Sequence, residues 1–151
     1  MPTAEECAYA AGFFDGEGSV YIRQPHGRAG HRSSYSICAS VGQDDIRPVL
    51  FLQRCWGGCI NPGPIRPNGK CNSRWTLVAA SAGRFLRDIL PYLIVKREQT
   101  ELALEIQSQK RPAGRWKPVD DDLMERWGQI KGQVTALNAR YPGFYDKQGV
   151  N

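Results

Sequence analysis

The chain has 151 residues, of which 41% are hydrophobic, enough for one domain with its own core. Twenty Lys and Arg against fifteen acids give a net charge of +5, which permits nucleic-acid binding without requiring it. No apolar run approaches the roughly 20 residues that a membrane span needs, and residues 1–6 lack the apolar core of a secretory signal. We therefore expect an intracellular protein, in the cytoplasm, nucleoid or an organelle matrix, that is neither secreted nor bound in a membrane.

The cysteines are five in number, and this odd count indicates free thiols in a reducing compartment. A zinc site would have to be assembled from Cys55, Cys59 and Cys71 with His26 and His31, and their spacing matches no standard zinc finger. Buried or inert cysteines are therefore favoured over structural zinc.

The start of the chain carries a helix signal. Thr3 and Glu6 form a capping box, in which each side chain binds the backbone N–H of the other residue, and this predicts a helix over residues 4–15. One face of the helix carries almost no side chain, because small residues recur at every fourth position: Ala8, Gly12 and Gly16. Such a stripe lets a second helix approach to backbone contact.

Glu17 stands at the C-terminal end of this helix, where the helix dipole is negative and an acid is disfavoured. An acid placed against the local field indicates a bound cation. The alternative is that the glycine-rich end, including Gly18, is only a C-cap. A C-cap does not explain the stripe, the second acid, Asp15, or the strand that follows.

Alternating patterns predict four strands, at residues 19–23, 34–41, 58–65 and 72–79, with a hairpin turn at 66–71. The side chains expected to face the core are Val20, Ile22, Tyr35, Ile37, Ala39, Val41, Trp75 and Leu77. Those expected to face outward are Tyr21, Arg23, Ser34, Ser36, Cys38, Ser40, Asn72, Arg74 and Thr76.

Four later helices are predicted at residues 46–55, 82–90, 96–110 and 120–140, the last two separated by a basic, proline-rich linker. Asp44 or Asp45 caps the first of these, and Ser81 caps the second, which Pro91 ends. The apolar positions are Ile46, Val49, Leu50 and Leu52 in the first helix and Leu102, Leu104 and Ile106 in the third.

The order of elements predicts an α+β fold, with an α-β-β-α-β-β-α core, a four-stranded antiparallel sheet and C-terminal helices. We expect a single domain over residues 1–151, with its core at about 3–110 and a C-terminal helical part at about 119–141. Helices should cover the apolar face of the sheet. The polar face is either merely solvated, as is usual, or a surface that reads DNA bases, because it is basic and rich in short hydrogen-bonding side chains.

Residues 10–18 read Ala-Ala-Gly-Phe-Phe-Asp-Gly-Glu-Gly and resemble the LAGLIDADG motif of homing endonucleases. The order of elements after one motif is similar to that of the single-motif members, which act as homodimers, and the similarity extends along most of the chain. The chain departs from the pattern at Ala10, where the motif has Leu, and at Glu17, where it has Asp. Gly42 stands where a bulkier residue is expected.

This resemblance implies roles for individual residues. Glu17 and the backbone carbonyl of Gly16 would bind Mg²⁺, with Mn²⁺ tolerated. Gln43 would orient the attacking water, Lys96 would lie near the scissile phosphate, and Arg47 would line the same pocket. For Lys96 and Arg47 the alternative is ordinary solvation at the surface. Two copies of the chain would pair through Ala8, Ala11, Gly12, Asp15 and Gly16.

The implied function is that of a homing endonuclease in intron mobility: a staggered double-strand break in a long, near-palindromic DNA target by metal-dependent hydrolysis. The sheet residues that would read bases are Tyr21, Arg23, Ser34, Ser36, Ser40, Asn72, Arg74 and Thr76. Those at hairpin tips, which would contact outer base pairs or phosphates, are Arg28, Arg32, Arg66 and Lys70. The alternatives are a group I intron maturase that binds RNA, a non-catalytic DNA-binding protein of this type, and an α+β interaction module.

Overall fold

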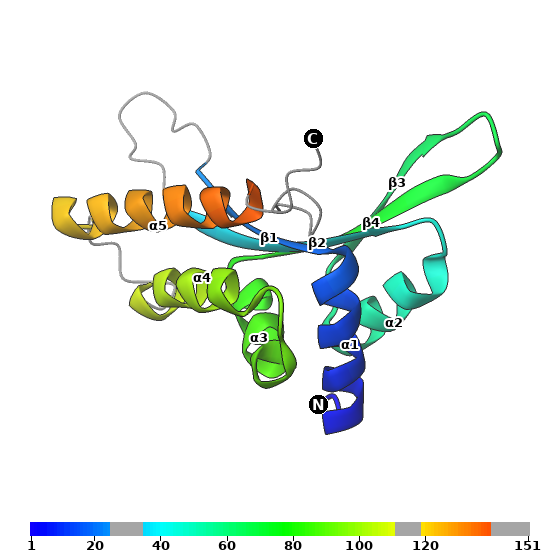
Figure 1. Cartoon of the computed structure of the whole chain (residues 1–151), viewed down its shortest axis with the longest axis horizontal. Helices are drawn as coiled ribbons and strands as arrows, with labels where there is room; N and C mark the ends of the chain where they lie inside the picture. The colour runs from blue at the N-terminus through cyan, green and yellow to red at the C-terminus, as the bar shows by residue number, and fades with distance from the viewer. Residues whose placement is uncertain (25–34, 111–118, 140–151) are drawn as a thin grey trace, which may run out of the picture.

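The computed structural model describes residues 1–24, 35–110 and 119–139, and it has the predicted α+β architecture (Figure 1). The elements in chain order are α1 (Ala4–Glu17), β1 (Gly18–Arg23), β2 (Ser36–Gln43), α2 (Ile46–Trp56), β3 (Cys59–Ile65), β4 (Cys71–Val78), α3 (Ala79–Ile89), the 3₁₀ turn η1 (Leu90–Tyr92), α4 (Arg97–Gln109) and α5 (Asp121–Ala139). Within the described residues, no helix is long and apolar enough to cross a membrane. All five cysteines are free thiols, as predicted.

The four strands form one antiparallel sheet in the order β1-β2-β4-β3. Helices α1, α2, α3 and α4 lie on one side of it, and the other face has no helix of the described part of the chain laid across it (Figure 1). Helix α5 lies against α4 and β1. Its Asn138 side chain donates to the carbonyl oxygen of Val20 at 2.8 Å and so satisfies an unpaired group on the edge strand.

The core is built around aromatic rings that join the helices to the sheet. Phe85 of α3 meets three rings edge to face: Phe14 of α1 at 5.3 Å between centroids, Trp56 of α2 at 5.1 Å and Trp75 of β4 at 5.0 Å. The indole nitrogens of both tryptophans are satisfied, since Trp75 donates to the Gly57 carbonyl and Trp56 to the Asp88 carboxylate. This cluster fixes the inner face of α1 and leaves its outer face open.

The sequence signals around the first hairpin are confirmed. Thr3 and Glu6 form the capping box, with Thr3 N–H donating to Glu6 at 2.9 Å and Glu6 N–H to Thr3 at 3.2 Å. The side chains predicted to face the core from β1, β2 and β4 are buried. Helix α1 continues two residues further than predicted, so that Gly16 and Glu17 belong to its last turn.

Three local predictions were wrong. Helix α3 begins at Ala79 and has no side-chain cap, so Ser81 is an exposed residue of its first turn. Ile46 and Leu50 of α2 are 44% and 46% exposed, because the buried face of the helix runs through Val49, Leu52 and Trp56 instead. Cys38 of β2, which we expected to face outward, is completely buried.

Gly18 ends α1 in extended backbone, with φ −85°, which any residue can adopt. A Cβ at this position would lie 2.2 Å from the buried ring of Phe14. We expect Gly18→Ala to lower the free energy of unfolding by about 1–3 kcal/mol, because the ring has to leave its packed position. Urea unfolding measures this difference. The control is Gly132→Ala in α5, where a Cβ meets nothing within 4 Å; equal stability of the two variants would contradict the prediction.

Candidate active site and nucleic-acid interface

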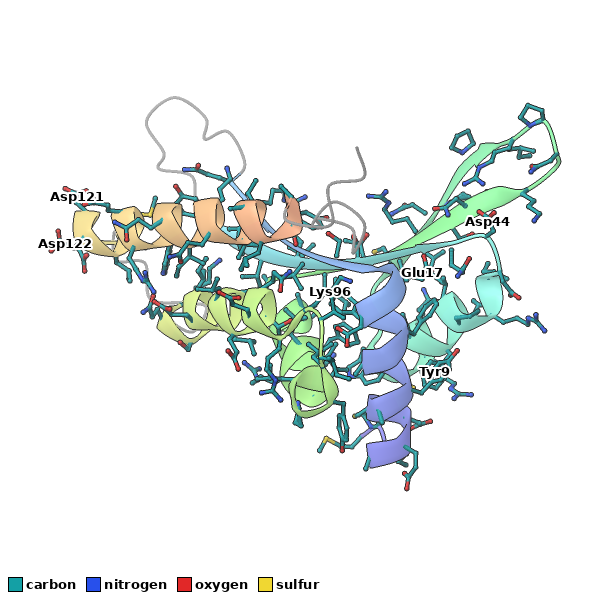
Figure 2. The ribbon with its side chains drawn as sticks, in the orientation of Figure 1. Tyr9, Glu17, Asp44, Lys96, Asp121 and Asp122 are labelled. Atoms are coloured by element: carbon teal, nitrogen blue, oxygen red, sulfur yellow. The ribbon has the colours of Figure 1, made fainter. Side chains whose placement is uncertain are left out.

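Glu17 is the last residue of α1 and is exposed where that helix meets the sheet. It opens onto a hollow in the polar face of the sheet, which is lined by Glu17, Ser19, Tyr21, Ser40, Gly42, Asn72 and Arg74. Figure 2 shows Glu17 at this end of α1, with Lys96 and Asp44 on opposite sides of it. The hollow therefore combines one carboxylate, one guanidinium and several short polar groups, and it draws them from β1, β2 and β4 as well as α1.

The carboxylate of Glu17 makes no hydrogen bond or ion pair with another described residue, and its position at a helix C-terminus adds the negative end of the dipole. The neighbouring carbonyls are partly used, since Phe14 accepts the Gly18 N–H and Asp15 accepts the Lys96 amine. The Gly16 carbonyl belongs to the group of helix-terminal carbonyls that lack a partner in the helix. Free hard oxygens of this kind suit Mg²⁺.

The described residues contain no cluster of three or more His, Cys, Asp or Glu that could hold a metal ion. The described part of one chain therefore supplies too few such side chains to enclose a cation. The donor set fits an ion that takes most of its ligands from water, from substrate phosphate oxygens, or from a second copy of the chain.

Asp15 lies two residues before Glu17 and is used within the chain. Its carboxylate accepts three backbone N–H groups just before α4: Ile94 at 2.8 Å, Val95 at 3.2 Å and Lys96 at 2.9 Å. We expected Asp15 at an interface between two copies. Within one chain its carboxylate fixes the end of α1 to the segment that carries Lys96, and its place at an interface stays a prediction.

Lys96 is brought close to the Glu17 end of α1. Its amine donates to the backbone carbonyl of Asp15. Burial lowers the pKa of Lys96, and the negative charges of Asp15 and Glu17 partly oppose that shift. The ammonium is therefore held beside the two acids of the motif rather than free at the surface.

Gln43 and Arg47 are not among the residues that line the hollow. The side-chain oxygen of Gln43 accepts the backbone N–H of Asp44 at 2.8 Å. The Arg47 side chain is 86% exposed and paired with Asp45, which is also the N-cap of α2. The Arg47 hydrogen bonds lower the pKa of Asp45 to about 2, and the same contact raises the pKa of Arg47.

The residues predicted to read DNA lie on the polar face where the structure describes them. Tyr21, Ser40, Asn72 and Arg74 line the hollow, and Thr76 and Ser36 continue the same face along β4 and β2. Arg23 is exposed at the end of β1, and Arg66 and Lys70 flank the β3–β4 turn. Arg28, Arg32 and Ser34 lie outside the described residues.

Sequence reasoning missed Asp44 as a site residue. It follows β2 and binds Asn72 and Arg66, two of the predicted DNA contacts. A signal was present, because two adjacent acids precede α2 and only one, Asp45, is needed as its N-cap.

The bare stripe of α1 is open to solvent. Ala8, Gly12 and Gly16 are exposed, and a Cβ built on either glycine meets nothing within 4 Å. Ala11, which we expected at the same interface, is completely buried in the chain's own core and offers no surface to a partner. The helical spacing places Ala11 about 100° away from Gly12, toward the sheet.

Apolar side chains border the stripe. Tyr9, 52% exposed, stacks along Phe13 on one side of it, and Ile94, 86% exposed, lies next to Asp15 on the other. An exposed apolar surface around a helix that has room for close approach is typical of a protein–protein contact.

Solved structures of homing endonucleases share this fold. The homing endonuclease I-CvuI, in complex with its target in the presence of Ca, matches over 93% of this chain and 84% of its own, with a TM-score of 0.69 and 23% identity. The archaeal intron-encoded homing endonuclease I-Vdi141I, complexed with DNA, matches over 93% of this chain and 87% of its own, with a TM-score of 0.71 and 17% identity. No family model matches the chain, and neither does any curated protein sequence.

A longer chain shows the same likeness over part of its length. The LAGLIDADG homing endonuclease I-LtrWI, bound to target DNA, matches 83% of this chain but 42% of its own, with a TM-score of 0.53 and 14% identity. The chain therefore has the fold of the LAGLIDADG homing endonucleases, as its motif predicted.

The hydrogen bonds of Asp15 can be tested directly. We expect Asp15→Ala to lower the free energy of unfolding by about 2 kcal/mol, because three backbone N–H groups lose a charged acceptor. Amide hydrogen exchange at residues 94–96 should accelerate at the same time. Asp122→Ala, an exposed acid in the first turn of α5, is the control. If both variants are equally stable, Asp15 does not hold the segment before α4.

Proposed function

We propose that this chain is a site-specific DNA endonuclease of the LAGLIDADG type, which hydrolyses both strands of a long, near-palindromic target in a divalent-metal-dependent reaction. The observation that carries the proposal is the placement of Glu17. It is an exposed acid without an ion pair to any other described residue, at the end of a helix with a face of small residues, and it opens onto the polar face of a four-stranded sheet. The DNA-bound homing endonucleases that share the fold support it.

The active form is a homodimer. One chain carries one motif, so it supplies one Glu17, whereas cutting two strands needs two catalytic acids. The exposed stripe on α1 and its apolar borders support pairing of two such helices around a two-fold axis. The match of this chain to under half of the longer I-LtrWI chain supports the same arrangement, since that chain has room for two units of this size.

Mg²⁺, with Mn²⁺ tolerated, would be held by Glu17 and the Gly16 carbonyl of each chain together with substrate phosphate. When bound, the metal would lower the pKa of the attacking water and stabilise charge on the leaving 3′ oxygen. Two Glu17 carboxylates close to one axis repel each other, so the dimer itself favours divalent cations there. The homing endonuclease I-CvuI forms complexes with DNA in the presence of Ca and in the presence of Mg, the latter with the DNA not cleaved, and this supports binding of a divalent cation.

The side chains around Glu17 position the scissile phosphate. Lys96, held beside Asp15, offers a positive charge to the phosphate as negative charge builds up on it. Gln43 orients the attacking water and Arg47 supports the phosphate; both functions require these side chains to turn away from Asp44 and Asp45 when DNA binds.

The polar face of the sheet lies along the major groove of each half-site. The exposed Arg23 and Arg74 provide side chains that pair bidentately with guanine, and Asn72 of β4 provides one that pairs with adenine. Arg66 and Lys70 at the turn contact phosphates or outer base pairs, as do Arg28 and Arg32. We place the protein inside the cell, where its DNA substrate lies.

Glu17→Gln tests the catalytic acid. We expect cleavage of a randomised double-stranded library in Mg²⁺ to fall by at least about 100-fold, because the neutral amide no longer supports the metal-dependent step. DNA binding should persist, because one negative charge is removed from the DNA-facing surface. Sequencing of the cut ends gives the target and the stagger together. The control is Glu125→Gln, an exposed acid of α5.

The same experiment separates the alternatives. Undiminished cutting by Glu17→Gln would refute the catalytic role. Selective binding by the native chain without cutting would indicate a non-catalytic DNA-binding protein, and selection of group I intron RNA over DNA would indicate a maturase.

Gly12→Leu tests the dimer. In one chain its side chain would extend into open space, so the fold should be retained, whereas in the dimer it would hold the two helices apart. We expect the variant to elute as a monomer at micromolar concentration and to lose double-strand cleavage. Gly132→Leu, an exposed helix position with equal room, should remain dimeric. A dimeric Gly12→Leu variant would place the interface elsewhere.

A further inference from the structure

Asp44 joins the end of β2 to the second hairpin. Its Oδ1 accepts a hydrogen bond from Asn72 Nδ2 at 3.3 Å, and its Oδ2 pairs with Arg66 Nη1 at 3.2 Å. Asn72 lies in β4 and Arg66 in the turn before it. One acid therefore holds two residues of the proposed DNA-binding surface.

The contact with Asp44 defines the orientation of the Asn72 amide. A carboxylate only accepts hydrogen bonds, so the Asn72 atom that faces it has to be the nitrogen. The amide oxygen then lies on the other side, over Gly42, where it is 2.9 Å from the place that a Cβ of that residue would occupy. Asn72 and Gly42 both line the hollow next to Glu17, so a hydrogen-bond acceptor is presented there.

Gly42 is part of the same arrangement. A side chain at this position would meet the oxygen of Asn72 and push the amide away. The glycine that stands where a bulkier residue was expected thus leaves room for Asn72 in one orientation. Two residues and one strand pairing fix the amide: Gly42 by its small size, Asp44 by its charge, and the β2–β4 pairing by its register.

We propose that Asp44 is a specificity-determining residue, which holds Asn72 so that its oxygen accepts a hydrogen bond from the exocyclic amino group of a target base, adenine N6 or cytosine N4. This inference rests on the proposed function. In the major groove only these two bases carry an amino donor, whereas guanine and thymine carry an oxygen at the corresponding place. An amide free to rotate would offer either its oxygen or its nitrogen and would accept all four.

Asp44 should lower the affinity for DNA although it raises the selectivity. Its negative charge lies on a surface that faces phosphates, and this repulsion is the same for every sequence. The orientation of Asn72, in contrast, affects binding at only one base pair of each half-site. Loss of Asp44 should therefore raise affinity for DNA in general while it lowers selectivity at that base pair.

The test is Asp44→Ala in the full chain, with library cleavage in Mg²⁺ and binding to a non-target duplex. We expect selectivity for adenine or cytosine to fall about 10-fold or more at one base pair per half-site, the same base pair that Asn72→Ala affects. Non-target binding should become tighter. Gly42→Ala, which displaces the amide without changing charge, should relax the same base pair, and it keeps the test valid if Asp44→Ala folds poorly.

Two control variants separate the orientation of Asn72 from the loss of a negative charge and from the loss of the Asp44–Arg66 ion pair. Asp45→Asn removes the same charge from the same loop, keeps the α2 cap and does not contact Asn72, so selectivity should stay unchanged. Arg66→Gln breaks the Asp44–Arg66 ion pair and also removes a proposed DNA contact, so it should weaken DNA binding in general and leave the base preference at the Asn72 position intact.

The outcomes are distinct. Native protein that selects no DNA would overturn the proposed function and this inference with it. Native selectivity that Asp44→Ala and Gly42→Ala leave unchanged, or relax at a base pair other than that of Asn72→Ala, would overturn the inference alone. A native preference for guanine or thymine at that base pair would overturn it as well.

Discussion

The carboxylate of Asp15 is the interaction on which the arrangement of the site depends. The three N–H groups that it binds precede α4, where no helical partner is available and the dipole of α4 is positive. A single side chain thus holds the segment that leads into one helix, fixes the end of another, and places Lys96 beside Glu17. Because residues two apart on a helix point about 200° away from each other, Asp15 can face the chain while Glu17 faces the hollow.

Much of the fold follows from local signals, and these were predictable. The capping box of Thr3 and Glu6 needs only four adjacent residues. The alternation of apolar and polar residues predicts which face of a strand is buried, and it can be seen in that strand alone. The bare stripe on α1 was visible for the same reason, since its four-residue spacing is a property of one helix. These elements allowed the sheet, its two faces and the position of Glu17 to be predicted before the tertiary structure was known.

The remaining details depend on residues that are distant in sequence. The partners of Asp15 lie 79 to 81 residues away, so its role within the chain could not be separated from a role at an interface. Ile46 and Leu50 have the spacing of a buried face, but packing against the sheet selects Trp56 instead. Likewise, Asp44 and Asp45 are equivalent as candidate caps, and only the position of the second hairpin shows that Asp44 binds Asn72 and Arg66.

Two acids on the proposed DNA-facing surface of a basic protein differ in how they are neutralised. Asp44 has two partners within the chain, the neutral amide of Asn72 and the guanidinium of Arg66, and it holds both in a defined geometry. Glu17 has no hydrogen-bonded partner among the described residues, and in the proposed enzyme Lys96 nearby and a cation taken up from solution would balance its charge. An acid with partners can set which base is accepted, whereas an acid without them creates the demand for a metal ion beside the phosphate. The proposed enzyme thus uses two different carboxylates for its two functions: Asp44 for selecting a sequence and Glu17 for cutting it.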